Sequence, residues 1–481
     1  MPPDLIDPGS EPFEDRNPAP GWSTTGTLEP GSYPEELRLT HPGGQGPMES
    51  TRTLSGISNG WYTLRARVRS SGRQKEAYIA LKDCGTDRAR AAVPIVASDK
   101  WLQIVVSAQV TNHRCTISLY SDAEEGEWVS FDKVEMVPGR AALTVRGADI
   151  SSLKKSEDKG GIYAYEDGTQ ADALKILHEH GLNYARLRVW VKSPDGYHGK
   201  FQLLEMAKRL RKYGIKLLVD FHYADSWADP GKQPKPAAWE DLDFKRLKRA
   251  LYDHTFDICN SLKEQGTPAD MVQVGNEINH GLLWPDGSIE DWDDLAALLK
   301  EGYRAVKDCS SETRVMLHLA EGGDNKLFRW WFDHALEREV PFDLIGVSYY
   351  PYWHGTFADL QNNLNDIALR YGKDILLVET AYPFTAQDHD NCENIVRSEE
   401  RPGYPFTPEG QRRMLADIMT IVRAIPNGCG LGVMWWDATW TAVPGNGWDP
   451  FNPSFGNNWE NQALFDYENR ALPALKLFDQ P

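Results

Sequence analysis

Two glutamates stand where apolar runs of the sequence end. Glu277 follows residues 271–276, and Glu379 follows residues 375–378. Burying a carboxylate beside apolar side chains is costly unless the charge has a partner or a chemical task. Two carboxyl groups that face each other can cleave a glycosidic bond, because one protonates the leaving oxygen while the other attacks the anomeric carbon or activates water. Either glutamate alone could belong to a structural ion pair, but together they predict a catalytic pair.

Alternating strands and helices must position this pair. From Leu143 onward, short apolar runs alternate with amphipathic patterns, several of which end in glycine, as helices often do. The predicted strands are 143–149, 184–190, 215–221, 271–276, 314–319, 343–349, 375–380 and 431–436. The predicted helices are 172–180, 203–213, 243–264, 292–308, 325–337, 356–371 and 408–424. This order predicts an α/β fold, a TIM (β/α)8 barrel. An open doubly wound sheet is the alternative, but no glycine-rich phosphate turn follows any strand.

The barrel prediction places both glutamates at one end of the barrel. Residues at the carboxyl ends of barrel strands face the active site, and Glu277 and Glu379 follow or end the fourth and seventh predicted strands. These strands lie across the barrel from each other, so the two carboxyl groups can approach over its mouth. A separation of about 5–5.5 Å would make one carboxylate the nucleophile and would predict retention of the anomeric configuration.

The first 140 residues have a different pattern. Apolar and polar side chains alternate, between turn-rich stretches, in 61–68, 101–106, 115–120 and 128–134. This period of two predicts a β-sandwich. The sequence therefore predicts two domains, an all-β domain over 1–140 and a barrel over 141–481.

Charge and hydropathy limit the partners. A formal net charge of −18 argues against nucleic acid or an anionic membrane surface. No run of about 18 apolar residues is present, so we expect no membrane-spanning helix. Residues 1–7 have neither the basic nor the apolar region of a secretory signal. We expect a secreted monomer whose signal peptide is not part of this sequence; a protein that is not exported by that route is the alternative.

The cysteines are compatible with disulfides. There are six, with no Cys-x-x-Cys pair, and two of them lie in the first domain. We predict the pairs Cys84–Cys115, Cys259–Cys309 and Cys392–Cys429. Buried free thiols of a cytosolic protein are the alternative.

The segments around the glutamates resemble those of known glycosidases. Residues 274–279, Val-Gly-Asn-Glu-Ile-Asn, are similar to the Asn-Glu signature of retaining barrel glycosidases that carry the acid/base on strand four and the nucleophile on strand seven. Within that superfamily, further segments resemble glycoside hydrolase family 53, the endo-β-1,4-galactanases: 146–151, 185–190, 220–233, 346–355 and 461–466. The resemblance implies a retaining endo-glycosidase that cuts β-1,4-galactan, with Glu277 as acid/base and Glu379 as nucleophile.

The resemblance also implies roles for neighbouring residues. Asn276 is expected to hydrogen-bond the 2-hydroxyl of the sugar being cut. Tyr349, rather than the adjacent Tyr350, is expected to donate a hydrogen bond to Glu379, and Arg188 to lower the pKa of the same carboxyl through its charge. The other expected sugar contacts are His222, Asp225, Trp227, Trp353, Trp448 and one of Trp435 and Trp436. The tryptophans are expected to contribute flat rings, which pack against sugar faces. Each of these side chains could instead be a core residue or a loop anchor.

One acidic segment resembles a calcium loop. Asp388, Asp390, Cys392 and Asn394 are spaced two residues apart, as in loops that bind calcium. Bacterial members of family 53 carry calcium in a similar stretch, with histidine where Cys392 stands, so the resemblance implies a structural calcium ion held by these residues. No cofactor is expected for catalysis. A solvated acidic loop is the alternative.

Other functions remain open at this point. Another retaining barrel endo-glycanase, such as a mannanase or cellulase, would keep the same glutamates. A non-catalytic carbohydrate-binding protein would not need them. His222 and Asp225 also allow a zinc hydrolase, but the compact spacing of a zinc motif is missing. The first domain resembles jelly-roll carbohydrate-binding modules, in line with a polysaccharide as the expected partner.

Overall fold

The structure of the protein is a computed structural model that describes residues 21–25, 28–30, 36–41, 43, 46–95, 99–398, 403–452 and 454–479. The segment 1–7, considered above as a possible signal, lies outside these residues. Backbone proximity divides the chain into two compact units. The first consists of 1–143, 399–405 and 416–428, and the second of 144–398, 406–415 and 429–481.

The first unit contains two antiparallel five-stranded sheets. One has the order β1 (Ser23–Thr25), β4 (Met48–Ser55), β9 (Arg114–Ala123), β6 (Gln74–Lys82) and β7 (Ala89–Ala92). The other has the order β2 (Leu28–Pro30), β3 (Leu37–Thr40), β10 (Trp128–Pro138), β5 (Gly60–Ser70) and β8 (Leu102–Val110). Leu64, Ile79, Ile104, Leu119 and Phe131 are fully buried, and strands of one sheet contact strands of the other. The all-β prediction for this region is confirmed.

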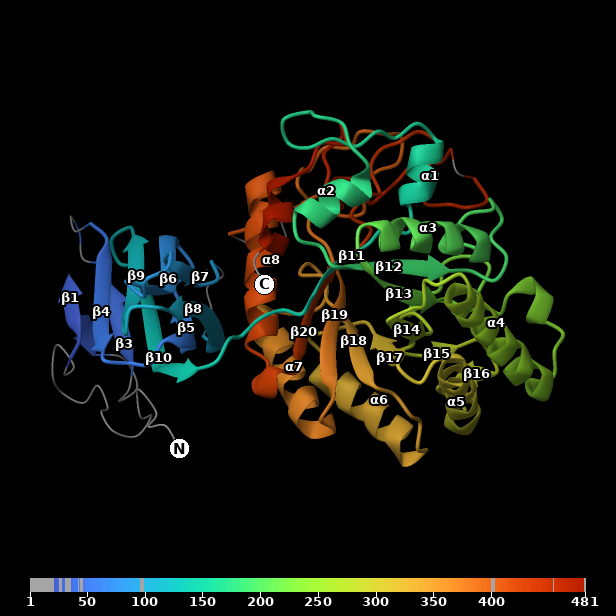
Figure 1. Ribbon diagram of the computed structural model, residues 1–481, viewed down its shortest axis with the longest axis horizontal. Coiled ribbons are helices and arrows are strands. Elements are labelled where there is room, and N and C mark those ends of the chain that lie inside the picture. The colour runs from blue at the N-terminus through green and yellow to red at the C-terminus, as the bar shows by residue number, and fades with distance from the viewer. Residues whose placement is uncertain are drawn as a thin grey trace. The chain divides into compact units, whose positions relative to one another are not determined.

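The second unit is a closed barrel of eight parallel strands (Figure 1). Its strands are β11 (Val145–Asp149), β12 (Tyr184–Val189), β13 (Lys216–Phe221), β14 (Met271–Val274), β17 (Arg314–Leu319), β18 (Leu344–Ser348), β19 (Asp374–Thr380) and β20 (Gly430–Trp435). The register pairs each strand with the next, and β20 closes the barrel against β11. The TIM-barrel prediction is confirmed, with strand ends within two residues of the expected ones.

Helices surround the barrel strands (Figure 1). They are α1 (Leu153–Asp158), α2 (Ala173–Glu179), α3 (Lys200–Lys212), α4 (Phe244–Glu264), α5 (Trp292–Cys309), α6 (Asn325–Glu337), α7 (Phe357–Tyr371) and α8 (Pro408–Arg423). Short polar side chains fix several starts: Asp172, Asp243, Asp291 and Asp324 accept backbone N–H groups, and Thr356 forms a capping box with Asp359. Only the short α1 was not predicted. A two-stranded hairpin, β15 (Gly281–Leu282) and β16 (Gly287–Ser288), follows β14.

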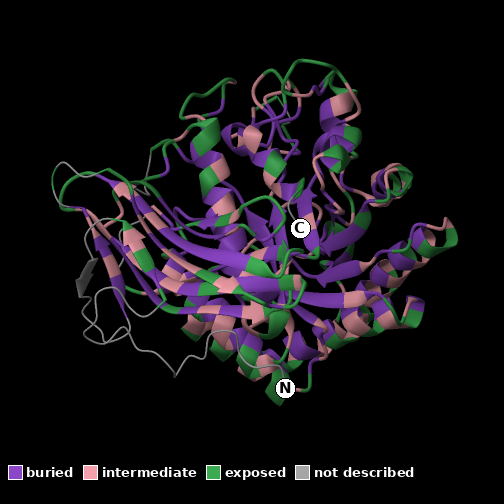
Figure 2. Ribbon diagram, turned by 60° about the vertical axis from the view of Figure 1, so that its left-hand side comes forward, coloured by how far each residue is buried: buried purple, intermediate pink, exposed green. Residues whose placement is uncertain are grey.

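An apolar layer fills the barrel nearer the amino ends of its strands. The layer contains Val145, Tyr184, Leu218, Met271, Met316, Leu344, Leu376, Val378 and Met434. Glycine is needed where strands pass these side chains: a Cβ on Gly346 would lie 2.4 Å from the Met316 sulfur, and one on Gly432 would lie 1.7 Å from the Val145 carbonyl oxygen. Nearly every residue of the barrel strands is buried, so the strands form a rigid support for the residues that follow them. In Figure 2 buried residues are purple and exposed residues, many of them on helices and loops, are green.

One predicted disulfide forms and two do not. Cys84 and Cys115 are bonded, whereas Cys259, Cys309, Cys392 and Cys429 are free thiols. Cys392 follows β19 and Cys429 precedes β20, so they belong to opposite ends of the barrel and cannot meet. Cys259 lies on α4 and Cys309 ends α5; burial and the nearby Cys309 raise the pKa of Cys259, so the two thiols are close, but they are not bonded.

No helix in the described ranges is long and apolar enough to cross a bilayer.

Candidate active site

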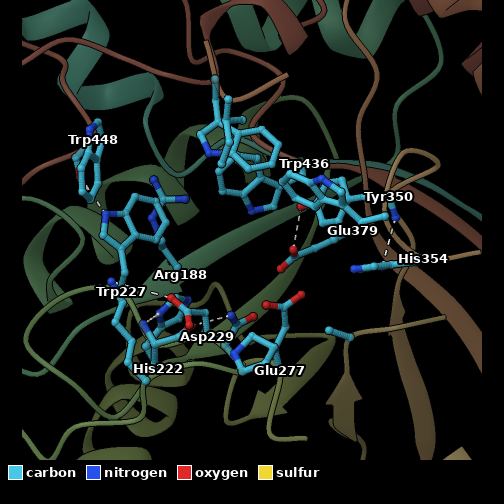
Figure 3. Close-up of a pocket in the computed structure, with 18 of the residues that line it drawn as sticks. Arg188, His222, Trp227, Asp229, Glu277, Tyr350, His354, Glu379, Trp436 and Trp448 are labelled. Atoms are coloured by element: carbon cyan, nitrogen blue, oxygen red, sulfur yellow. Dashed lines mark hydrogen bonds and ion pairs between the residues drawn. The ribbon is translucent and has the colours of Figure 1, made fainter. Parts of the chain in front are cut away.

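A cavity of about 400 Å³ opens where the barrel strands end (Figure 3). Its lining comes from β12, from the end of β19 and from the loops after β13, β14, β17, β18, β19 and β20. Glu277 and Glu379 both line it, together with Asn276. The prediction that the fourth and seventh strands bring two glutamates to one mouth therefore agrees with the geometry.

The two carboxyl groups are close together. One carboxylate oxygen of Glu277 and one of Glu379 lie within 4.8 Å of each other and of a ring nitrogen of His318. Both glutamates are buried, at 9% and 4% exposure. Glu277 has a left-handed backbone, with φ of 47°, a conformation that costs energy in a residue with a side chain and is often found at functional sites. The turn after β14 thus directs the side chain of Glu277 into the cavity.

Arg186, not Arg188, is the arginine that binds Glu379. Its guanidinium lies 2.7 Å from Glu379 Oε1, 2.8 Å from Asp220 and 3.0 Å from Asp149, and it is almost fully buried. Burial opposes its charge, but the three carboxylates outweigh burial and raise the pKa of Arg186. Residues two apart on a strand share one face, so the sequence placed both arginines on the inner face without telling which of them reaches Glu379.

Arg188 lies one step further along β12 and belongs to the cavity wall. It pairs with Asp437 at 2.8 Å, and its guanidinium carbon lies 4.2 Å from the centre of the Trp227 ring. Burial raises the pKa of Asp437 to about 6, with Arg188 opposing the shift. The expected contact between Arg188 and Glu379 is therefore wrong, although Arg188 does line the cavity.

Tyr350, not Tyr349, is the tyrosine that contacts Glu379. Its hydroxyl donates to Glu379 Oε2 at 2.9 Å, whereas the hydroxyl of Tyr349 donates to the carbonyl oxygen of Gly355 at 3.0 Å. β18 ends at Ser348, so the alternation that holds within a strand gives no guide to the two tyrosines after it. Burial and the charge of Glu379 raise the pKa of Tyr350 well above its usual value, so its hydroxyl keeps its proton and remains a donor.

The two glutamates have different electrostatic surroundings. Burial, and then the charge of Glu379, raise the pKa of Glu277 well above the ordinary glutamate value. Burial also raises the pKa of Glu379, but Arg186 and the Tyr350 hydroxyl oppose that shift. Because Glu379 has these two stabilising partners, Glu277 is the carboxyl group that holds a proton more readily. Glu277 is thus the better placed of the two to donate a proton, and Glu379 the better placed to stay ionised.

Asn276 and His222 line the cavity at fixed positions. Asn276 Oδ1 accepts from Arg186 at 2.7 Å and its amide donates to the Ala228 carbonyl oxygen at 2.9 Å. His222 Nδ1 accepts from the Ala228 N–H at 3.1 Å, and Nε2 donates to Asp220 at 3.0 Å. The loop after β13 and the turn after β14 are therefore tied together beside Glu277.

Asp225 does not line the cavity. Its two carboxylate oxygens accept the backbone N–H groups of Lys192 and Ala237, at 2.8 and 2.9 Å. Asp225 therefore stabilises the loop after β13, and the prediction that it contacts the sugar is corrected. A short polar side chain in a long loop is equally suited to either task, which the sequence could not distinguish.

The aromatic wall contains most of the predicted tryptophans. Trp227, Trp353, Trp436 and Trp448 line the cavity, while Trp435 is fully buried and donates its indole N–H to the Gln462 carbonyl oxygen. Trp435 is the last residue of β20 and points away from the cavity, whereas Trp436, the first residue after the strand, lines it. Trp353 is 46% exposed and offers an open ring face.

Several lining residues were not predicted. Trp440 and Trp459 complete the wall, with the Trp459 ring 4.7 Å from that of Trp436. Asp229, Glu321 and His354 add polar groups to the lining. All follow strands or lie in the long loop after β20, so their place in the sequence was the one signal that could have identified them.

Among the described His, Cys, Asp and Glu side chains, Glu277, His318 and Glu379 are the one group of three whose possible ligand atoms all lie within 4.8 Å of one another. The arrangement does not fit a metal ion. His318 Nδ1 accepts from Gln273 at 2.8 Å, and Nε2 donates to the Ser348 hydroxyl at 2.8 Å, so both ring nitrogens are engaged. The nearby charge of Arg186 would also repel a cation.

The acidic loop after β19 uses its carboxylates on the backbone. Asp388 accepts from the Asn394 N–H at 2.7 Å, and Asp390 accepts from the Cys392 N–H at 2.7 Å and from the Asn457 N–H at 2.6 Å. Glu460 lies against the same loop, accepting from the His389 and Asp390 N–H groups. Burial raises the pKa of Glu460 to about 7.

A parallel eight-stranded barrel with two close carboxyl groups over its mouth defines a barrel glycoside hydrolase. The sequence model of glycosyl hydrolase family 53 matches residues 145–478. The chain belongs to glycosyl hydrolase family 53.

Relatives of known name match the barrel region. An endo-beta-1,4-galactanase of Bacillus subtilis is 33% identical over 380 residues, which cover 72% of this chain and 87% of the relative. An arabinogalactan endo-beta-1,4-galactanase A of Emericella nidulans is 35% identical over 341 residues, covering 69% and 93%. Among solved structures, the GH53 catalytic domain of Ignisphaera aggregans is 40% identical with a TM-score of 0.68, covering 71% of this chain and 97% of that one.

Proposed function

We propose that the protein is a retaining endo-β-1,4-galactanase in which Glu277 is the acid/base and Glu379 the nucleophile. The observation that carries the proposal is the approach of the two carboxylate oxygens to within 4.8 Å, which leaves no room for a water molecule positioned for direct attack. Inverting enzymes need a wider separation, whereas retaining enzymes hold the groups about 5–5.5 Å apart.

The first half of the reaction forms a covalent intermediate. Glu277, whose pKa is raised by burial and by Glu379, protonates the glycosidic oxygen as the bond breaks. Glu379 attacks the anomeric carbon and forms a glycosyl ester. Asn276 lies beside the pair with its amide oriented by Arg186, suitable for a hydrogen bond to the 2-hydroxyl of the same sugar.

The second half releases the product. Once Glu379 is esterified, its negative charge is lost, so the pKa of Glu277 falls and its carboxylate can take a proton from water. Water then attacks the anomeric carbon from the side that the leaving group vacated. Arg186 and Tyr350, at 2.7 and 2.9 Å from the Glu379 oxygens, stabilise the carboxylate when it is expelled. The two inversions give net retention.

The substrate class follows from the relatives and from the wall. The named relatives are endo-β-1,4-galactanases, and the lining has many indole rings, which pack against the apolar faces of sugars. We assign β-1,4-galactan, including arabinogalactan of that linkage, as the polysaccharide substrate. The test is reducing-end release from linear galactan, mannan and cellulose, with NMR of the first product. Fast release from galactan with the β-anomer formed first supports the proposal; preference for another glycan or an α-anomer contradicts it.

We further propose that the loop after β19 holds a structural calcium ion. Asn394 Oδ1 and Glu460 Oε2 are buried acceptors without a hydrogen-bond partner among the described residues, and an ion bound by oxygen atoms would satisfy them. Asp388, Asp390 and the carbonyl oxygen of Cys392 would supply the other ligands, because a thiol is a poor ligand for calcium. EDTA should lower the unfolding temperature and added calcium restore it; an unchanged temperature contradicts the site.

We also propose that the protein acts outside the cell, because galactan is too large a polymer to be imported before it is cut. Activity in the culture medium, absent from washed cells, would test this.

A further inference from the structure

Glu277 has a buried hydrogen-bond partner that does not line the substrate cavity. Ser348 ends β18, is fully buried and is absent from the described lining of the cavity. Its side chain hydrogen-bonds the carboxyl group of Glu277, and its hydroxyl oxygen lies 2.8 Å from Nε2 of His318. His318 is equally buried, and one of its ring nitrogens lies within 4.8 Å of a Glu277 carboxylate oxygen. Ser348 therefore connects the imidazole to the acid/base without contact with the sugar.

The surroundings of His318 decide which of its ring nitrogens carries the proton. Nδ1 lies 3.3 Å from the backbone nitrogen of Glu277, whose N–H can only donate. Nδ1 also lies 2.8 Å from the amide nitrogen of Gln273, which in turn donates to the Asp220 carboxylate at 2.7 Å. Burial and the charge of Arg186 lower the pKa of His318 well below its usual value, so the ring is neutral. Nδ1 is thus the acceptor, and the proton is on Nε2.

A proton on Nε2 fixes the direction of the Ser348 hydroxyl. Because Nε2 donates to the hydroxyl oxygen, that hydrogen bond does not use the proton of the serine. The serine proton is free for the Glu277 carboxyl group, which has an oxygen that can accept whether or not Glu277 is protonated. We propose that Ser348 is a positioning residue for the acid/base: His318 orients the serine hydroxyl so that it donates to Glu277. This inference rests on the proposed function and adds the group that holds its acid/base in place.

The hydrogen bond has a consequence for both halves of the reaction. Glu277 must hold a proton before the glycosidic bond breaks and must accept one from water afterwards. Burial and the charge of Glu379 raise the pKa of Glu277, and the hydrogen bond from Ser348 opposes them, because a donor stabilises the ionised carboxylate more than the acid. Ser348 therefore keeps Glu277 able to act as a base as well as an acid.

The charged and titratable groups that also act on Glu277 belong to the cavity. They lie on β12, after β13, after β18 and on β19, and they are Arg186, Asp229, Tyr350 and Glu379. All four line the cavity, so their surroundings change when a substrate displaces water. Ser348 and His318 are fully buried behind Glu277, and their effect on it stays constant through the reaction.

Neutron diffraction tests the arrangement in the unmodified protein. A crystal of the full chain grown in heavy water should show deuterium on His318 Nε2 and none on Nδ1. The deuterium on Ser348 Oγ should point towards the carboxyl group of Glu277. Deuterium on Nδ1, or a Ser348 hydroxyl that points to another acceptor, would overturn the inference.

Ser348→Ala tests the same contact in solution. Without the donor, the pKa of Glu277 should rise, so the basic limb of the kcat/KM profile on galactan should move up by about one pH unit. KM should change less than twofold, because Ser348 does not contact the sugar. Thr380→Val is the matched control: it removes a fully buried hydroxyl, next to Glu379 in the chain, that has no hydrogen-bond partner among the described residues. A limb that stays in place in Ser348→Ala, or that moves equally in Thr380→Val, would contradict the role of Ser348.

This failure can be told apart from failure of the proposed function. An unmoved limb in a variant that still cuts galactan with retention would remove the role of Ser348 alone. Inversion of configuration by the wild-type enzyme would overturn the double displacement, and this inference with it.

Discussion

The two ends of the barrel interior contrast sharply. Nearer the amino ends of the strands, Val145, Tyr184, Met271 and Leu344 pack in an apolar layer that includes no charged side chain. Nearer the carboxyl ends, the barrel strands bury Asp149, Arg186, Asp220 and Glu379, and Glu277 is buried just beyond β14. Buried ion pairs contribute little to stability against apolar packing of the same volume, whereas apolar layers contribute much. The comparison teaches that one end of the barrel holds the fold together and the other carries the chemistry.

The largest expected effect is at the charged end. Glu379→Ala should lower kcat by about 10⁴-fold or more, because no other group can form the glycosyl intermediate. Azide should restore part of the turnover and give a glycosyl azide of inverted configuration, measured by NMR. Glu277→Ala is the partner variant, which should recover activity on substrates whose leaving groups need no protonation. Full activity of Glu277→Ala on galactan would show that the acid is elsewhere.

The next effect separates the two adjacent tyrosines. Tyr350→Phe should lower kcat by about 10²-fold and raise the pKa of Glu379, because the hydroxyl that stabilises the ionised form is lost. The acidic limb of the kcat/KM profile should therefore move to higher pH. Tyr349→Phe is the matched control: it removes a hydroxyl that donates to the Gly355 carbonyl oxygen and not to Glu379, and it should leave the profile in place. Equal shifts in both variants would contradict the assignment.

Truncation in the apolar layer should have the opposite signature. Leu376→Ala should lower the free energy of unfolding by about 2–5 kcal/mol through lost contacts and a cavity, measured by urea denaturation. The kcat of the folded fraction should change less than twofold. A large fall in kcat without loss of stability would break the division between the two ends of the barrel.

The smallest effect concerns pH and stability at the charged end. The pKa of Glu277 is raised in the folded state, so its contribution to stability is fully present below the pKa of an unfolded glutamate and is lost as the pH rises from there through the raised pKa of Glu277. Glu277→Gln removes this dependence, and its unfolding temperature relative to wild type should increase between pH 4 and pH 8. A constant difference across that range would mean that Glu277 ionises normally in the folded protein.

The sequence predicts the strands and helices of the barrel better than it predicts the side-chain contacts at the active site. The eight strands and seven of the helices follow from periodicity and caps, and Glu277 and Glu379 follow from their place at strand ends. The contacts with Glu379 were predicted for Arg188 and Tyr349, but Arg186 and Tyr350 make them. The reach of a side chain and the path of the chain beyond β18 are three-dimensional properties that the sequence does not show. Trp459 and His354 lie in loops, where no regular period relates a residue to the cavity.

The most direct measurement is the identity of the residue that becomes glycosylated. A 2-deoxy-2-fluoro-galactobioside with an activated leaving group slows release of the intermediate, so mass spectrometry of peptides can locate the ester. The account predicts one added disaccharide on the peptide that contains Glu379, lost on incubation with acceptor sugar. A label on another residue, or full turnover with no trapped ester, would contradict it.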